Sequence, residues 1–177
     1  MLSGVPVILK KEQFRFTNNN FIAPWGVIMN TDTLLLTLKN DIEEFNIPNS
    51  LKQSTVVYFM RAANCAQCNR HTRDLEKLLP ELEKRNMGVI VVVPENEAAV
   101  AKVRERNNLT VPVMWGNGNA HALAGLDKKL LGIIQQSGTV VVDQAGVVLY
   151  KRIATNPEES FKVKEFEDYL ASVNLVQ

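Results

Sequence analysis

The sequence predicts an α/β fold: one domain in which helices flank a mixed central sheet, preceded by an N-terminal extension of short strands. Two continuous β-prone runs, residues 54–60 and 88–93, alternate with amphipathic helical patterns at residues 66–85 and 95–107. This alternation favours a sheet that starts with parallel strands. A hairpin pattern at residues 139–150 adds antiparallel strands. The length of 177 residues, with 46% hydrophobic and 22% charged residues, suits a single globular domain.

The N-terminal extension, residues 1–53, has the weakest pattern. Short strands are expected at residues 5–9, 14–17, 25–29 and 33–37, the last two as a hairpin. Asn40 is a candidate N-cap for a short helix over residues 41–45. We expect this extension to pack on the core, which we place at residues 54–177.

The core begins with a strand and a long helix. The run at residues 54–60 has no polar alternation, which is typical of a strand buried on both faces. The helix over residues 66–85 carries one apolar stripe of leucines: Leu75, Leu78, Leu79 and Leu82. Pro80 lies inside this pattern and predicts a kink or a break there.

The remaining core elements follow between short loops. They are a strand at 88–93, a helix at 95–107, an extended piece at 109–114, a small helix or turn at 127–131, a hairpin at 139–142 and 147–150, and a closing helix at 161–173. From residue 54 the order is therefore β-α-β-α, an extended piece, and β-β-α. This is the element order of a thioredoxin-like fold.

Two cysteines, Cys65 and Cys68, follow the first core strand and begin the long helix. Free N–H groups and the helix dipole stabilise a thiolate at a helix N-terminus and lower its pKa. The C-x-x-C spacing also brings the two sulfurs within reach of each other. The pair therefore predicts thiol–disulfide exchange, in which Cys65 attacks a substrate disulfide and Cys68 resolves the mixed disulfide.

Other interpretations of the cysteine pair remain open. A zinc site needs four ligands, and His71 and His121 are the only histidines that could complete it. Two buried thiols without chemistry are a second alternative. A redox-inert binding or sensing domain on the same fold is a third.

The stretch at residues 59–68 resembles the active-site segment of peroxiredoxins of the alkyl hydroperoxide reductase/thiol-specific antioxidant (redoxin) type. That segment reads F-x-P-x-x-x-T-x-x-C and fits here without a gap. The resemblance covers residues 54–152 and is strongest to the bacterioferritin-comigratory branch. It implies a thioredoxin-fold protein and an alternative function as a thiol-dependent peroxidase, with Cys68 as the peroxidatic cysteine.

Three positions depart from this family pattern. The family's proline falls at Arg61, its threonine at Cys65, and the arginine that precedes its threonine-initiated strand at Ser137. These departures favour disulfide over peroxide chemistry, because nothing obvious orients a peroxide. The cation of Arg61 would stabilise a nearby thiolate, so the candidate catalytic residues are Cys65, Cys68 and Arg61. His71 is interpreted as an exposed surface residue rather than a proton shuttle.

The composition of the chain limits which binding partners and which cellular location are expected. The 20 Lys and Arg balance the 19 Asp and Glu, and this near-neutral charge predicts neither nucleic-acid nor membrane binding. No signal segment is visible, so the protein is expected to be cytoplasmic if the chain starts at its natural end. The cysteines carry the electrons, so no cofactor or metal is expected. The resemblance implies a thioredoxin- or glutathione-type reductant and a disulfide or hydroperoxide substrate, and it leaves a homodimer open.

Overall fold

A computed structural model describes residues 15–17, 20–22, 28–30, 32–48 and 52–173. The chain divides into two compact units between Asp32 and Thr33. The first unit contains a three-stranded antiparallel sheet, in which β2 (Asn20–Ile22) lies between β1 (Arg15–Thr17) and β3 (Ile28–Asn30). The strand expected at residues 5–9 lies outside the described residues.

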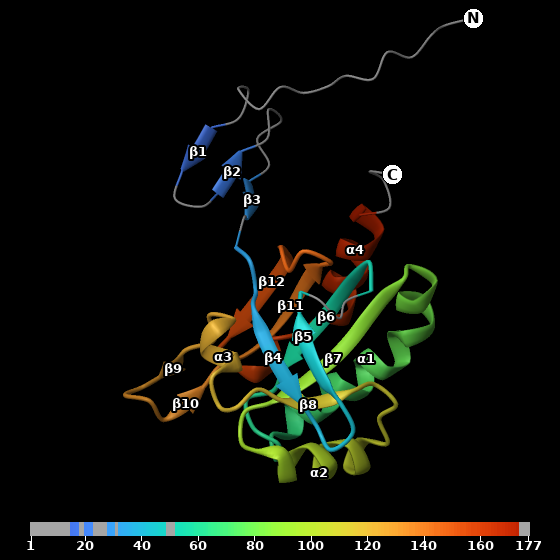
Figure 1. Cartoon of the computed structure of the whole chain (residues 1–177), viewed down its shortest axis with the longest axis vertical. Coiled ribbons are helices and arrows are strands. Elements are labelled where there is room, and N and C mark those ends of the chain that lie inside the picture. Colours follow the sequence, from blue (N-terminus) through green and yellow to red (C-terminus); the bar gives the residue numbers. More distant parts are fainter. Residues whose placement is uncertain (1–14, 18–19, 23–27, 31, 49–51, 174–177) are drawn as a thin grey trace, which may run out of the picture. The chain divides into compact units, whose positions relative to one another are not determined.

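The second unit is built on a seven-stranded mixed sheet (Figure 1). Its strands, in spatial order, are β12 (Val148–Ala154), β11 (Ser137–Asp143), β6 (Ser54–Phe59), β7 (Met87–Val93), β8 (Val113–Trp115), β4 (Leu36–Lys39) and β5 (Glu44–Ile47). The pairs β6–β7 and β7–β8 are parallel, and the outer pairs are antiparallel. The mixed central sheet expected from the sequence is therefore confirmed.

Helices cover both faces of this sheet. They are α1 (Ala66–Lys84), α2 (Glu97–Asn107), α3 (Ala120–Leu123) and α4 (Val163–Val173), with a 3-10 turn η2 (Pro157–Glu159) before α4. Along β6, Val56 and Tyr58 face the cluster that contains α1, α2 and α4, whereas Val57 and Phe59 face the cluster that contains α3. The period of two explains why this run is apolar throughout: both of its faces are buried.

One local prediction was wrong, and a second was right only in part. The helix expected over residues 41–45 is instead a turn followed by β5. The Asn40 side chain accepts hydrogen bonds from the backbone N–H groups of Ile42 (2.8 Å) and Glu43 (2.9 Å), which reverses the chain between β4 and β5. At residues 127–131, where a small helix or turn was expected, there is no helix: β9 (Lys128–Lys129) pairs with β10 (Ile134–Gln135) in a short hairpin, and its turn begins at Leu130.

Three further features differ from the expected boundaries. β3 pairs with β2, and β4 pairs with β5 and β8, so the two do not form the hairpin expected across residues 25–37. Helix α1 runs unbroken through Pro80. The sheet begins before residue 54, since β4 and β5 belong to it. Among the described helices, none is long and apolar enough to cross a membrane.

Candidate active site

Cys65 occupies the N-cap of α1, the first helix after the central strand β6. Its backbone is extended (φ −66°, ψ 111°), and its Sγ accepts a hydrogen bond of 3.2 Å from the backbone N–H of Cys68. A side chain at an N-cap normally satisfies this donor with oxygen. Here sulfur takes that place, so the thiol lies at the positive end of the helix, where a thiolate is favoured.

The two thiols have opposite environments. Cys65 is partly exposed, whereas Cys68 is fully buried (0% exposed), and both are free. The hydrogen bond from the Cys68 thiol, with smaller contributions from the Cys68 N–H and the charge of Arg61, lowers the pKa of Cys65 to about 6 despite partial burial. The same hydrogen bond, followed by burial, raises the pKa of Cys68. At neutral pH the pair therefore holds a thiolate at Cys65 and a thiol at Cys68.

The loop before Cys65 is fixed by side chains from several elements. Asn69 donates to the carbonyl groups of Ala63 (2.9 Å) and Cys65 (2.8 Å). Arg106 of α2 donates to the same Ala63 carbonyl (3.1 Å), and Glu95 accepts from the Ala63 N–H (2.6 Å). These bonds fix the backbone around Cys65, and such a preorganised loop lowers the cost of orienting a reacting group.

Arg61 lies beside the two cysteines, as expected from the sequence. Its backbone hydrogen-bonds the Cys68 sulfur, and its charge acts on Cys65. The side chain is half-buried and lines a cavity of about 290 Å³, together with His121, Lys128 and Gln135. Two cations, Arg61 and Lys128, and one carboxylate, Glu95, thus line this cavity.

The interpretation of His71 as an exposed residue was wrong. Its side chain is buried (4% exposed), with Nδ1 3.0 Å from the Tyr58 hydroxyl and Nε2 3.1 Å from the Gln67 amide nitrogen. Burial lowers the pKa of His71 to about 4, so the ring is neutral at pH 7. The sequence did carry a signal: Cys68, His71 and Leu75 follow the i, i+3, i+7 spacing of the buried face of α1.

Ser137 occupies the position at which the family carries an arginine. It is the first residue of β11, and its buried hydroxyl has no hydrogen-bond partner within the described part of the chain. Thr139, two residues further on, donates to the backbone carbonyl of Ser160 (2.8 Å). This position therefore supplies no cation to the cysteine pair.

The four donors of the zinc alternative do not come together. His71 faces Tyr58 on one side of the sheet. His121 packs on Phe59, whose side chain points to the other side, and donates to the Met60 carbonyl (2.7 Å). Within the described ranges, no group of three or more His, Cys, Asp or Glu side chains is placed to hold a metal ion.

Comparison with solved structures supports the fold. A peroxiredoxin-like protein from Aquifex aeolicus superposes with a TM-score of 0.68 at 16% identity, covering 85% of this chain and 90% of that one. Peroxidoxin BcpB from Mycobacterium tuberculosis superposes with a TM-score of 0.65 at 19% identity, covering 84% of this chain and 98% of that one. AhpC from Enterococcus faecalis superposes with a TM-score of 0.65 at 13% identity, covering 82% of this chain and 90% of that one. These similarities confirm the thioredoxin-like fold.

The sequence itself points to the same family. No curated protein sequence matches this chain. The model of the AhpC/TSA family matches residues 31–151, which is more than half of the chain and includes both cysteines. The resemblance noted from the active-site segment is therefore confirmed: the chain belongs to the AhpC/TSA family and is an oxidoreductase.

Proposed function

We propose that this protein is a thiol–disulfide oxidoreductase that cycles between a dithiol and a Cys65–Cys68 disulfide. The supporting observation is the division of labour between the two thiols. Cys65 is partly exposed and has a pKa lowered to about 6, whereas Cys68 is buried and has a raised pKa. An exposed thiolate suits attack, and a buried thiol suits resolution of the intermediate.

The reaction proceeds in two exchanges. The Cys65 thiolate attacks one sulfur of a substrate disulfide, so a Cys65–substrate S–S bond forms and the other substrate sulfur leaves as a thiolate. Cys68 then loses its proton and attacks the Cys65 sulfur. The Cys65–Cys68 disulfide forms, and the second substrate thiol is released. Two electrons pass to the substrate, and a thioredoxin- or glutathione-type thiol returns them to the enzyme.

The surroundings of Cys65 assist the first exchange. Arg61 favours the thiolate through its positive charge, and its side chain also lines a cavity together with Glu95 and Lys128. No bound cofactor is required, because the cysteines carry the electrons. A cytoplasmic location belongs to the same proposal, since there a reducing thiol pool would regenerate the dithiol.

A second candidate function is a thiol-dependent peroxidase, which family membership favours. Cys68 aligns with the peroxidatic position. A thiolate there would attack a peroxide oxygen, with O–O cleavage and loss of water or an alcohol, and the sulfenic acid would condense with Cys65 and release water. Burial and the raised pKa of Cys68 weigh against this order of attack.

Stopped-flow oxidation of the pre-reduced protein at pH 7.5 tests both candidates, with hydrogen peroxide and a small disulfide mixed separately. We expect fast reaction with the disulfide, lost in Cys65→Ser. Cys68→Ser should keep the first exchange and accumulate a mixed disulfide visible by mass spectrometry. The chain has two cysteines in all, so each thiol signal is unambiguous.

Other outcomes select the alternatives. Fast oxidation by peroxide that is lost in Cys68→Ser but kept in Cys65→Ser would establish the peroxidase with Cys68 attacking. Slow reaction of the wild-type protein with both oxidants would contradict any redox role and leave the inert binding or sensing domain.

A further inference from the structure

Two buried asparagines connect the end of α2 to the loop before Cys65. Asn69 lies in the first turn of α1 and is 4% exposed, and Asn107 is the last residue of α2 and is 6% exposed. Asn107 Nδ2 donates to Asn69 Oδ1 (2.5 Å), and Asn69 Nδ2 donates to the carbonyl groups of Ala63 and Cys65. Arg73 Nη1 in turn donates to Asn107 Oδ1 (2.6 Å). A continuous chain of hydrogen bonds therefore runs from Arg73 to the backbone of Cys65.

The two ends of this chain fix the orientation of both amide groups. A guanidinium group can only donate, so Asn107 must turn its oxygen to Arg73 and its nitrogen to Asn69. Backbone carbonyl groups can only accept, so Asn69 must turn its nitrogen to them and its oxygen to Asn107. The second hydrogen of the Asn107 amide goes to the Val103 carbonyl (2.9 Å). Both amide groups thus use all of their donors, and turning either one around would bring like groups face to face.

The carbonyl groups held by Asn69 belong to the backbone that sets the position of the nucleophile. The Cys65 carbonyl accepts from both the backbone N–H (3.0 Å) and the side chain (2.8 Å) of Asn69. The same amide nitrogen holds the Ala63 carbonyl (2.9 Å). One fixed point before Cys65 and one after it therefore hold its backbone in the extended conformation (ψ 111°), in which its sulfur accepts from the Cys68 N–H (3.2 Å).

We propose that Asn107 positions Cys65 for attack, by turning the Asn69 amide nitrogen toward the backbone carbonyl groups on either side of the nucleophile. The inference rests on the proposed function, in which Cys65 attacks first. Asn107 acts through Asn69, so it is a positioning residue. An apolar contact between α1 and α2 would fill the same space without the cost of burying two amide groups. The amide chain adds direction, because only one of its two orientations holds the loop.

Asn107→Asp reverses the chain with almost no change of shape. A carboxylate can only accept, so Asn69 must turn its nitrogen to the new carboxylate and its oxygen to the two backbone carbonyl groups, which also accept. The loop is then pushed away rather than held, and the Cys65 sulfur loses its hydrogen bond from the Cys68 N–H. Arg73 lies opposite the new carboxylate and pairs with it, so we expect the variant to fold.

The pH profile of the first exchange reports this loss. The pKa of Cys65 is about 6 in the wild-type protein. Loss of one hydrogen bond to the thiolate should raise this pKa by about one pH unit in Asn107→Asp. With a small neutral disulfide, the rate at pH 6 relative to the rate at pH 9 should therefore fall about fivefold, because less of the thiol is ionised at the lower pH. The midpoint of Cys65 alkylation should shift by the same amount.

Three further variants separate positioning from charge and from packing. Asn108→Asp makes the same change on the next residue, which is exposed, and should leave the pH profile unchanged. Asn107→Ala creates a larger cavity but lets Asn69 keep both carbonyl groups, so its profile should shift less than that of Asn107→Asp. Asn69→Leu has no amide to turn, so its midpoint should already be raised. Adding Asn107→Asp to it should raise the midpoint no further.

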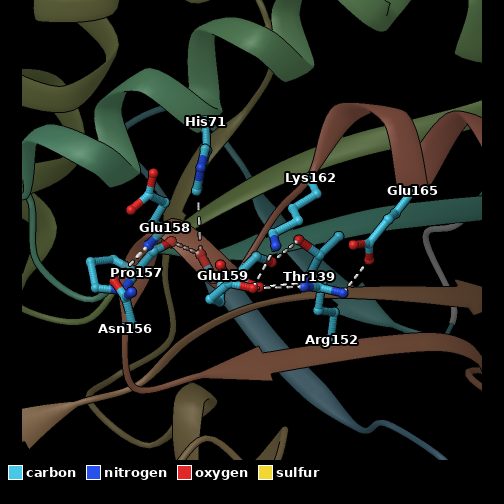
Figure 2. A network of polar contacts seen from close by, with 10 residues as sticks. His71, Thr139, Arg152, Asn156, Pro157, Glu158, Glu159, Lys162 and Glu165 are labelled. Atoms are coloured by element: carbon cyan, nitrogen blue, oxygen red, sulfur yellow. Dashed lines mark hydrogen bonds and ion pairs between the residues drawn. The ribbon is translucent and has the colours of Figure 1, made fainter.

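The other polar groups near the cysteines keep their places in these variants. The charged ones around the loop are Arg61, Glu95 and Arg106. The buried histidine of α1 is separate from the amide chain, because His71 points toward the turn that contains Ser160, as Figure 2 shows. A shift of the pH profile that is absent from Asn108→Asp can therefore be assigned to the amide chain.

The outcomes distinguish this inference from the proposed function. A wild-type profile in Asn107→Asp and Asn69→Leu would overturn the positioning role. So would a larger shift in Asn107→Ala than in Asn107→Asp, which packing would explain, or an equal shift in Asn108→Asp, which charge would explain. Should Asn107→Asp not fold, Asn69→Leu decides: a raised midpoint supports the inference and a wild-type midpoint overturns it. If the wild-type protein shows no ionised Cys65 below pH 7, or releases no product from the disulfide, the proposed function itself fails.

Discussion

At the scale of single residues, the acidity of Cys65 has causes of unequal weight. The hydrogen bond from the Cys68 thiol is the largest, and the charge of Arg61 is smaller. We therefore expect Cys68→Ala to raise the pKa of Cys65 by roughly one to two pH units, the equivalent of one hydrogen bond to a charged group. Arg61→Ala should raise this pKa less. The rate of alkylation of Cys65 as a function of pH measures both.

Cys68→Ser is the control for this ranking, because the serine hydroxyl keeps a donor beside Cys65. Its alkylation midpoint should stay nearer to the wild-type value than that of Cys68→Ala. A larger shift in Arg61→Ala than in Cys68→Ala would show that charge, rather than the thiol hydrogen bond, controls the nucleophile.

The residues of the site differ in how well their positions could be predicted from the sequence. Cys65, Cys68 and Arg61 were predicted together because they lie within one strand–loop–helix segment, where sequence spacing fixes distance. The buried hydrogen bonds of Tyr58 with His71 and Ser160 could not be predicted in this way. Tyr58 meets a histidine 13 residues away and Ser160 102 residues away, and only the packing of η2 against α1 brings the three together.

At the scale of elements, α1 contains an internal proline that it does not need for its fold. Pro80 is exposed, and the helix continues through it although the ring removes one N–H donor. Pro80→Ala should restore this bond and stabilise the protein by up to about 3 kcal/mol. Urea unfolding measures the gain, and alkylation of Cys65 should be unchanged. An unaltered unfolding midpoint would mean that the proline already costs nothing in this helix.

The elements also show where local patterns stop being informative. The alternation of β6, α1, β7 and α2 was predicted because each carries a strong period of its own. The segment at residues 41–47 was not, because Asn40 offers the same side-chain oxygen to a helix start and to a turn. The choice is made by the sheet, since β4 pairs with β8 and offers β5 a free edge.

At the scale of the whole molecule, both faces of the sheet bury a neutral histidine. His71, on the buried face of α1, lies beside Tyr58, and His121 lies against Phe59 on the opposite face of the sheet. Burial is the largest cause in each case and lowers the pKa of both to about 4. Because the sheet separates them, their contributions to the free energy of unfolding should add.

These two histidines predict a specific sensitivity to acid. In the unfolded chain a histidine takes up a proton near pH 6.5, whereas in the folded protein it resists protonation down to about pH 4. The unfolded state therefore binds more protons across this window, and stability is present above pH 6.5 and is lost as the pH falls toward 4. The lowered pKa of Cys65 acts with the same sign between about pH 8.5 and 6. Between pH 7 and pH 5 each histidine should account for a loss of roughly 2 kcal/mol.

Urea unfolding at pH 7 and pH 5 measures this loss as a difference within each variant. His71→Asn and His121→Asn lower the absolute stability, because each removes a buried contact, yet each should shrink the pH-dependent difference by about 2 kcal/mol. In the double variant, the pH-dependent difference should shrink by the sum of the two single-variant effects. If both single variants keep the full wild-type difference, carboxylates rather than the buried histidines set the acid limit.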